Sequence, residues 1–279
     1  MKIAIIAAGE MGSAIGARLR QRGADVTTSL RGRGAASAQR AQRAGMEAVD
    51  DDDALVSAAD FLLSILPPVE AVPLAERLAP ALARRAPGLV YVDCNAVAPE
   101  TAHRVGAIAA AAGARFVDVG IIGGPPRADG HGPHLYAAGE AAGALMALGD
   151  FGLDVRLVEG GIGAASALKL SYAALTKGLS AIAIGVARAA AAGACAEALR
   201  AEFLESQPLL FQWLQRQIPT VDRKAYRWVG EMEEIARFLG PDATADMFAG
   251  AAGVYRGIAA HHAAQDAAGL GFLADLFRR

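Results

Sequence analysis

The chain has 279 residues, of which 54% are hydrophobic and 20% charged, so it is long enough for two domains and too apolar to be disordered. Its formal net charge of −2 gives no basic surface for nucleic acid or for an anionic membrane. Two cysteines, Cys94 and Cys195, form neither a disulfide framework nor a metal-binding pattern, which favours reduced thiols.

The N-terminal apolar run after Lys2 ends at Gly9 and Glu10, which is short for a signal peptide. The sequence contains no run of about 18 uncharged apolar residues, so we expect no membrane span. Together with the reduced thiols, these features predict a cytoplasmic protein.

The first half of the chain alternates short β-rich runs with helical stretches. One helix is expected to stop at Gly23, and another to run from Pro99 to about Ala112. Continuous apolar strands separated by helices predict a parallel sheet covered on both faces, as in a Rossmann-type α/β domain. The expected strands span residues 2–8, 24–30, 46–50, 60–66, 88–95, 114–124, 132–140 and 155–161.

The pattern changes after Gly163, where almost thirty residues lack a proline or a strand signal. We expect one long helix over about 163–192, and only helices after it. Asp222 and Asp242 are candidate N-caps of two of them. The sequence therefore predicts an α/β domain over 1–161 and an all-α domain over 162–279, with the long helix linking them. The later helices are expected around 196–218, 222–239 and 242–265, with a short piece to Arg279.

The turn after the first strand, AAGEMG, has the context of a dinucleotide-binding loop: strand, glycines, helix, strand. Gly9 stands where a pyrophosphate approaches the backbone, and Gly12 where the helix packs on the strand. Ala7 replaces the first glycine of the G-x-G-x-x-G fingerprint, which is tolerable if φ stays negative. We expect Gly9, Glu10, Met11 and Gly12 to bind a cofactor; the alternative is a purely structural βαβ turn.

The second strand ends without the acidic residue that reads a ribose 2′-hydroxyl. Ser29, Arg31 and Arg33 stand there instead, and guanidinium groups pair well with phosphate. These residues favour NADP over NAD, although the two arginines would also suit an ordinary solvated loop.

Four segments resemble the β-hydroxyacid dehydrogenase superfamily, in the order of that family, and they cover nearly the whole chain. That group includes 3-hydroxyisobutyrate dehydrogenases, 6-phosphogluconate dehydrogenase and, more distantly, imine reductases. The segments are AAGEMG, similar to the cofactor loop; DCNAVAPET (93–101), similar to the substrate motif; VDVGIIGGPP (117–126), similar to the glycine-pair segment; and GIGAASALKLSYAALTKG (161–178), similar to the catalytic helix.

This chain departs from the family where Asn95 and Ala96 replace a Ser-Thr pair, and where Tyr172 and Ala173 replace two asparagines. The departures resemble a branch whose C-terminal domain is described only as 6-phosphogluconate-dehydrogenase-like. The resemblance implies an NAD(P)-dependent oxidoreductase and a helical domain that forms a homodimer. It does not name the small-molecule substrate.

Lys169 lies in an otherwise apolar helix, on one face with Ser166, Tyr172, Thr176 and Ser180, all within about 60° of it. Such a stripe lines a cavity, an interface or solvent, and a lysine there can also extend to water. The resemblance makes Lys169 the general acid/base, with a pKa lowered in a water-poor cleft. Tyr172 would hold the substrate oxygen or donate a proton, or alternatively pack between domains.

Other residues complete the expected site. Asn95 and Ala96 would bind substrate, and the Asn95 amide can both donate and accept. Gly123 and Gly124 would offer backbone N–H groups to a carboxylate. Leu66 and Pro67, and also Asn95, would lie beside the cofactor at the carboxyl edge of the sheet.

Several polar clusters do not predict a site. The run Asp50–Asp53 suits a solvated turn that caps the next helix, and the histidine pairs form no coherent ligand set, so we expect no metal. Trp213 and Trp228 are expected to pack the helical domain, although Trp228 with Glu231 and Glu234 would also suit a substrate cleft. The histidines are His131, His134, His261 and His262.

Three functions remain open at this stage. The first is NADPH-linked reduction of a small carbonyl, or oxidation of a β-hydroxy acid, with Lys169 as acid/base. The second is imine reduction on the same fold with Tyr172 as proton donor. The third is a protein that binds NADPH without catalysis.

Overall fold

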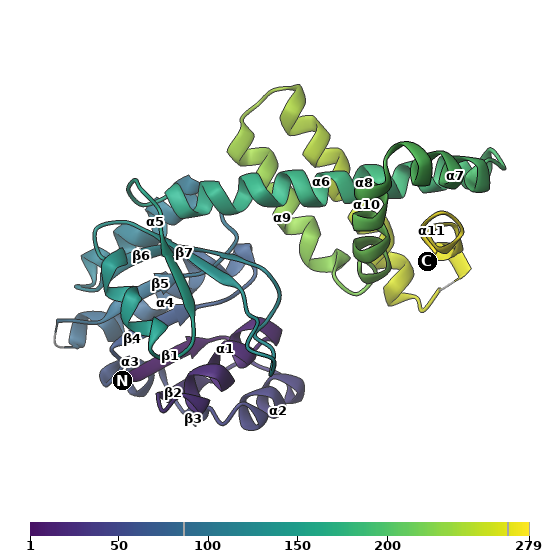
Figure 1. The fold of residues 1–279 in the computed structure, drawn as a ribbon. Coiled ribbons are helices and arrows are strands. Elements are labelled where there is room, and N and C mark those ends of the chain that lie inside the picture. Colours follow the sequence, from purple (N-terminus) through teal and green to yellow (C-terminus); the bar gives the residue numbers. More distant parts are fainter. Residues whose placement is uncertain (86, 267, 279) are drawn as a thin grey trace. The chain divides into compact units, whose positions relative to one another are not determined.

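Eight strands of the described residues form one sheet in the order β3-β2-β1-β4-β5-β6-β7-β8 (Figure 1). The structure is a computed structural model, and it describes residues 1–85, 87–266 and 268–278. The strands are β1 (Lys2–Ile6), β2 (Asp25–Ser29), β3 (Glu47–Val49), β4 (Phe61–Ser64), β5 (Val90–Asp93), β6 (Arg115–Ile122), β7 (His134–Ala138) and β8 (Asp154–Leu157).

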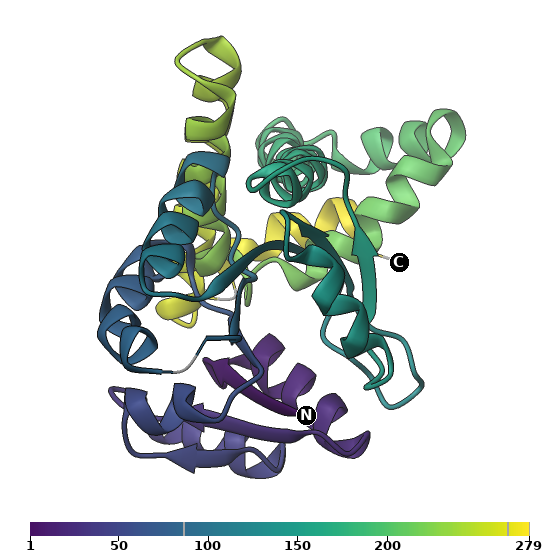
Figure 2. The ribbon, with the colours of Figure 1, turned by 90° about the vertical axis from the view of Figure 1, so that its left-hand side faces the viewer.

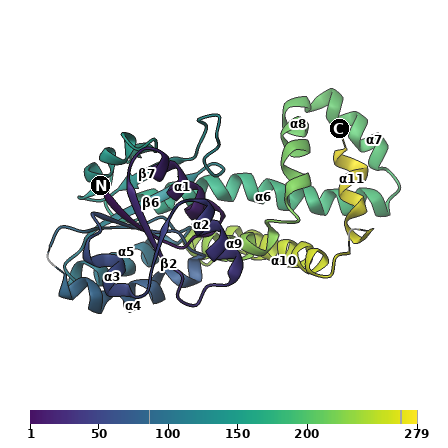
Figure 3. The same ribbon diagram turned by 90° about the horizontal axis from the view of Figure 1, so that it is seen from below.

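Helices cover both faces of this sheet because its strands are apolar on both sides. One core packs α1 and α2 with the short helix η2 against the face that carries Ile5 and Val92. The other core packs α3, α4 and α5 against the face that carries Leu62 and Tyr91, and these three helices lie together in Figure 3. The helices are α1 (Glu10–Gln21), α2 (Ala35–Arg43), α3 (Asp52–Ser57), η1 (Pro68–Glu70), α4 (Ala71–Arg84), α5 (Pro99–Ala111) and η2 (Ala142–Gly149).

The sequence predicted a parallel sheet, but the sheet is not parallel throughout, because β7 runs antiparallel to β6. The strands from β3 to β6 are parallel, and β8 is again parallel to β7. The reason is the connection: residues 123–133 between β6 and β7 contain no helix, and a short loop returns the chain in the opposite direction.

The rest of the described chain is helical. The long helix α6 (Ala164–Ala192) agrees with the predicted span of about 163–192. The Gln207–Pro208 step divides the expected helix around 196–218 into two, because proline cannot continue a helix from the preceding residue. The helices are α7 (Ala196–Ser206), α8 (Pro208–Gln217), η3 (Ile218–Thr220), α9 (Ala225–Leu239), α10 (Ala243–Ala263), η4 (Ala268–Leu270) and α11 (Gly271–Phe277).

Helices α9 and α10 form a hairpin joined by Gly240 and Asp242 (Figure 2). Asp242 caps α10 as predicted, because its Oδ1 accepts the N–H groups of Thr244 and Ala245. The prediction that Asp222 is an N-cap is wrong, since α9 begins at Ala225 after Lys224.

The chain divides into two compact units, Met1–Lys169 and Leu170–Arg279. The division falls inside α6 rather than at residue 161, because the first turn of α6 is hydrogen-bonded to β6. The Rossmann-type unit and the all-α region, joined by a long helix, agree with the predicted fold class.

Helix α6 is the one helix among the described residues that is long and apolar enough to cross a membrane by length and composition. Of its most apolar window, 39% is buried within the protein, and core helices pass the same test. This property is therefore weak evidence for a membrane span.

Candidate active site

The turn between β1 and α1 has the geometry of a pyrophosphate site. Gly9 is the N-cap of α1, with φ −74°, and a Cβ placed on it would meet no atom within 4 Å. Neither backbone conformation nor packing inside the protein therefore requires glycine at this position. Open space in front of a helix N-terminus is what a phosphate group needs.

Gly12 is a glycine for a different reason. A Cβ on it would overlap the carbonyl oxygen of Ala7, so α1 starts closer to β1 than any side chain allows. Gly16, one turn later, packs against a side chain instead, since its Cβ would lie 2.8 Å from Sδ of Met46. Of the two predicted cofactor glycines, Gly9 thus faces open space, whereas Gly12 allows α1 to pack closely against β1.

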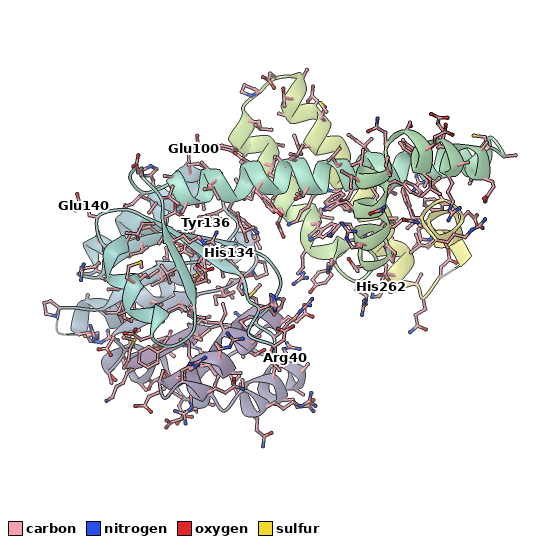
Figure 4. The ribbon with its side chains drawn as sticks, in the orientation of Figure 1. Arg40, Glu100, His134, Tyr136, Glu140 and His262 are labelled. Atoms are coloured by element: carbon pink, nitrogen blue, oxygen red, sulfur yellow. The ribbon has the colours of Figure 1, made fainter. Side chains whose placement is uncertain are left out.

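Arg40 on α2 also shapes this turn. Its Nε donates to the carbonyl oxygen of Ala8 over 3.0 Å, and its second guanidinium nitrogen donates to Ser37 Oγ over 3.1 Å. Figure 4 shows Arg40 on this helix. Arg40 therefore ties the cofactor turn to the helix that follows β2, a contact that nothing in the local sequence indicated.

The loop after β2 presents cationic side chains. Arg31 is 65% exposed and lies 3.8 Å from Asp52 Oδ2, an oxygen that Arg77 Nε also approaches to 3.4 Å. Arg33 is exposed, and the buried Ser29 accepts the backbone N–H of Arg31 on its Oγ. Arg31 of the loop and Arg77 on α4 thus share one carboxylate, and Arg33 adds a second positive charge to the loop.

A row of polar side chains crosses three neighbouring strands, at the carboxyl ends of β4 and β5 and in the middle of β6. Ser64 on β4 is the register partner of Asp93 on β5, and Asp93 is the partner of Asp118 on β6. Register partners in parallel strands point to the same face, which is the face covered by α4 and α5. All three side chains are almost completely buried.

Asn95 organises the end of this row. Its Nδ2 donates to Ser64 Oγ over 2.8 Å and to Asp93 Oδ1, and its Oδ1 accepts the N–H of Leu66 over 2.5 Å. The residue is 3% exposed, and its amide makes hydrogen bonds within the protein. These bonds leave one lone pair of the Asn95 carbonyl oxygen unused. Through its hydrogen bond to Leu66, Asn95 orders the start of the LPP segment, which includes Pro67. Ala96, the next residue after Asn95, is half-buried.

Burial controls the ionisation of this row. Desolvation raises the pKa of Asp93 to about 7, against hydrogen bonds from Asn95 that lower it, and the nearby Asp118 raises it further. Burial likewise raises the pKa of Asp118, although its hydrogen bonds to Ser166 and Gly163 act in the opposite direction. The pKa of the Cys94 thiol is raised by the same burial and by the two carboxylates, so this cysteine is not an activated nucleophile.

Lys169 lies in the second turn of α6, directly against β6. A Cβ placed on Gly120 would lie 2.9 Å from Cβ of Lys169 and 2.7 Å from the Ala165 carbonyl oxygen. Because Gly120 has no side chain, the lysine-bearing turn rests on the strand backbone itself. Lys169 is half-buried, whereas the other residue predicted to be catalytic, Tyr172, is 53% exposed.

The predicted polar stripe of α6 is mostly used within the protein. Ser166 donates to Asp118, while Thr176 and Ser180 donate to carbonyl oxygens one turn earlier on α6. Among the expected substrate residues, Gly123 has φ +122° and, with Gly124, is exposed just after β6. A positive φ of this size suits only glycine.

The second unit contains a buried ion pair that the sequence analysis did not identify. Lys177 pairs with Glu231, and both side chains are about 15% exposed. The ammonium of Lys177 lies 5.2 Å from the ring centre of Trp228, which contacts Tyr255 edge-on at 5.1 Å. Trp228 is 8% exposed, as expected for a residue that packs the helical region.

The four histidines singled out in the sequence each contact an aspartate at the surface. Nδ1 of His134 is 2.8 Å from Asp154 Oδ2, and Nδ1 of His262 is 3.7 Å from Asp222 (Figure 4). Within residues 1–85, 87–266 and 268–278, no group of three or more His, Cys, Asp or Glu side chains suits a metal ion. The aspartate run forms a helix cap, because Asp51 accepts the N–H of Ala54 over 2.7 Å.

The described residues form two surface depressions of about 550 Å³ each, one in each unit. One is formed by α5, the start of β6 and the residues before α6, and includes His103, Arg115 and Glu140. The other is formed by α8, η3 and α11. Neither has a lining residue from the cofactor turn or from the Ser64–Asp118 row, among the described residues.

Sequence analysis missed Asp118, Gly120, Ser64, Arg40 and Lys177. Asp118 carried a signal, because a carboxylate within the apolar run RFVDVGII has to be paired if it is buried. Lys177 carried the same signal as Lys169, a lone lysine in an apolar helix. The close approach of Gly120 and the reach of Arg40 depend on tertiary contacts that no local pattern encodes.

Comparison with known proteins identifies the family to which this chain belongs. Residues 2–147 match the NAD binding domain of 6-phosphogluconate dehydrogenase, and residues 189–258 match a domain of unknown function, DUF1932. An uncharacterized 28.5 kDa protein of Methanothermus fervidus is 28% identical over 186 residues, 67% of this chain and 69% of that protein.

Solved structures agree in fold. Mycobacterium tuberculosis 3-hydroxyisobutyrate dehydrogenase with L-serine has a TM-score of 0.72 at 20% identity, covering 99% of this chain and 97% of that one. An imine reductase from Myxococcus stipitatus in complex with NADP+ has a TM-score of 0.57 at 19% identity, covering 95% and 94%. The match over residues 2–147, together with the shared fold, makes this chain a member of the β-hydroxyacid dehydrogenase superfamily, with the NAD binding domain of 6-phosphogluconate dehydrogenase at its N-terminus.

Proposed function

We propose that this protein is an NADP-dependent oxidoreductase that transfers hydride between the nicotinamide and a small carbonyl or β-hydroxy acid, with Lys169 as general acid/base. The observation that carries the proposal is the seating of Lys169 against Gly120, in a unit whose β1–α1 turn leaves open space at Gly9. A lysine fixed on a strand backbone is better suited to proton transfer than one that reaches into water.

The residues of the first unit fit a nicotinamide cofactor. Gly9, Glu10, Met11 and Gly12 would hold the pyrophosphate at the N-terminus of α1, where backbone N–H groups favour an anion. Ser29, Arg31 and Arg33 would hold a 2′-phosphate, which the net positive charge of that loop supports. Leu66, Pro67 and Asn95 would lie beside the nicotinamide half, and the cofactor supplies or accepts the hydride when bound.

The substrate would lie where the carboxyl ends of β5 and β6 meet α6. Exposed backbone N–H groups at Gly123 and Gly124 would bind a carboxylate or the substrate oxygen, with Asn95 and Ala96 alongside. When a carbonyl is reduced, negative charge develops on its oxygen, and the ammonium of Lys169 would neutralise it by donating a proton. In the oxidative direction the neutral amine would take the hydroxyl proton.

Imine reduction is a second candidate, with Tyr172 as proton donor. Tyr172 is 53% exposed on α6, so its phenol is accessible to a ligand. Imine reductases share this fold, as the Myxococcus stipitatus enzyme illustrates.

NADPH oxidation, assayed against panels of aldehydes, β-keto acids and cyclic imines, tests the proposal with wild type, Lys169→Ala and Tyr172→Phe. We expect Lys169→Ala to lower kcat for carbonyls by about 100- to 10,000-fold, the usual contribution of a general acid, with little change in NADPH affinity. Loss of imine but not carbonyl turnover in Tyr172→Phe would support the second candidate. NADPH binding without turnover on any panel would instead indicate a non-catalytic binding protein.

A homodimer formed through α6 is part of the proposal. The part of α6 in the second unit carries apolar side chains at spacings of three and four residues, the pattern of a coiled-coil seam. Tyr172, Leu175 and Ile182 are each more than half exposed, which is unusual for large apolar residues in regular succession. A second copy of the chain is the partner that such a seam fits. The seam residues are Tyr172, Leu175, Leu179, Ile182, Val186 and Ala189.

A further inference from the structure

Asp118 is a carboxylate within an apolar strand. It is 1% exposed, and its neighbours along β6, Val117 and Val119, are completely buried. An ionisable group in such a place is unfavourable unless hydrogen bonds compensate it. The hydrogen-bond partners of Asp118 therefore indicate its structural role.

The Asp118 carboxylate accepts hydrogen bonds from the start of α6. Oδ2 accepts the backbone N–H groups of Gly163 and Ser166 over 2.9 and 3.0 Å, and Oδ1 accepts the Ser166 hydroxyl over 2.6 Å. The first turn of a helix has N–H groups without partners in the helix, and a carboxylate is their best acceptor. Here the cap comes from a strand 45 residues earlier, so it also joins two elements.

Gly120 supplies the second point of contact. It follows Asp118 by two residues, so both face the same side of β6. A Cβ on Gly120 would come within 2.7 Å of the Ala165 carbonyl oxygen and 2.9 Å of Lys169 Cβ. The strand thus bonds α6 at Ser166 and contacts it at Ala165 and Lys169, which fixes the rotation and the height of this turn.

We propose that Asp118 is the positioning residue of Lys169: it clamps the first turn of α6 to β6, so that the lysine leaves the helix over Gly120. Asp118 acts through Ser166 and the helix backbone and does not touch the substrate. Its consequence for catalysis rests on the proposed function of Lys169, whereas the positioning itself does not.

The lysine content of the chain allows a direct test. The sequence has four lysines, Lys2, Lys169, Lys177 and Lys224, so reductive methylation with isotope-labelled formaldehyde gives few NMR signals, and Lys169→Arg assigns the one of interest. We expect Asp118→Ala to shift and broaden the Lys169 signal and to move its titration midpoint. The Lys177 signal, from a lysine paired with Glu231, is expected to stay.

Matched variants separate positioning from a general loss of stability. Asp242→Ala removes an aspartate cap of the same kind from α10, and is expected to leave the Lys169 signal in place. Ser166→Ala keeps both backbone bonds to Asp118 and is expected to have a smaller effect than Asp118→Ala. Asp118→Asn keeps an acceptor oxygen and is expected to restore the signal in large part.

Kinetics provide the second readout. Asp118→Ala is expected to lower kcat by about 10- to 100-fold, the effect of misplacing a catalytic group by about 1 Å, while KM for NADPH changes little. Asp118→Asn should recover most of kcat, and the pH profile of kcat should shift in Asp118→Ala alone. If Asp118→Ala does not fold, Gly120→Ala tests the same contact from the strand side and should displace the same signal.

An unchanged Lys169 signal in folded Asp118→Ala and Gly120→Ala overturns the inference. A displaced signal in a protein whose turnover is insensitive to Lys169→Ala would support the positioning and reject the catalytic role of the lysine. The two proposals can therefore fail separately.

Discussion

Asp93, at the carboxyl end of β5, and Asp118, in the middle of β6, are register partners, so two buried carboxylates point to the same face of the sheet. The carboxylate oxygens of Asp118 accept hydrogen bonds from the start of α6, whereas Oδ2 of Asp93 has no hydrogen-bond partner among the described residues. Of the two, Asp93 is therefore the one whose ionisation is poorly compensated.

The first prediction concerns the pH dependence of stability. Burial raises the pKa of Asp93 from an ordinary 3.8 to about 7 in the folded protein, so between these values the folded state binds more protons than the unfolded state. Asp93 therefore stabilises the fold below about pH 4, and this contribution is lost as the pH rises towards 7, by at most about 1.4 kcal/mol per pH unit.

Asp93→Asn removes this titration while keeping an acceptor for Asn95. Its unfolding free energy relative to wild type should increase between about pH 4 and about pH 7 and then stay constant, as measured by urea denaturation. Asp25→Asn, at a side chain that is 69% exposed, is the control. Parallel stability curves for wild type and Asp93→Asn would show that Asp93 does not titrate in this range.

The second prediction separates the two glycines of the cofactor turn. Gly9→Ala meets no atom of the protein and should leave the melting temperature nearly unchanged, yet reduce NADPH affinity because the methyl group enters the pyrophosphate space. Gly12→Ala overlaps the Ala7 carbonyl and should destabilise the protein by about 1–3 kcal/mol. Thermal unfolding and fluorescence titration with NADPH measure both effects, and equal affinity in wild type and Gly9→Ala would reject the pyrophosphate site.

The third prediction concerns the 2′-phosphate. Replacing both Arg31 and Arg33 with alanine should weaken NADPH binding by about 100-fold or more, since each charged hydrogen bond contributes about 1.5–3 kcal/mol, which is about 10- to 100-fold in affinity. NADH affinity should change little, because NADH has no 2′-phosphate. Isothermal titration with both cofactors checks this, and a wild-type preference for NADH would contradict the assignment to NADP.

The fourth prediction tests the α6 seam. Ile182→Lys places a charge in the middle of the seam and should convert a dimer to a monomer in sedimentation velocity measurements. Leu209→Lys, at an 81% exposed leucine on α8, is the matched control and should remain a dimer. A wild-type protein that sediments as a monomer at micromolar concentration would refute the seam as a dimer interface.

The sequence predicted those parts of the molecule that have a local pattern. Apolar runs, glycines and the proline-free stretch were sufficient for the α/β unit and for α6. They were not sufficient for the direction of β7, which depends on a helix-free loop, nor for the start of α9, where Asp222 was an equally good cap by composition.

Only some residues of the candidate site have a local signal in the sequence. Gly9 and Lys169 stand out in their local sequence as glycine before a helix and lysine in an apolar helix. The internal use of Asn95 and the seating of Lys169 on Gly120 come from strands that meet only in the folded sheet. Pairwise contacts across such distances leave no periodic signal in a single sequence.

The division of the chain after Lys169 has a practical meaning for engineering. A chimera could replace everything beyond Lys169 with the helical region of a relative. It would retain the β1–α1 turn, the hydrogen bonds of Asp118 and Lys169 together in one block of sequence. The proposed substrate residues Asn95, Ala96, Gly123 and Gly124 and the proposed acid/base Lys169 would all stay in that block, so any change in substrate range in such a chimera would come from the exchanged helical region.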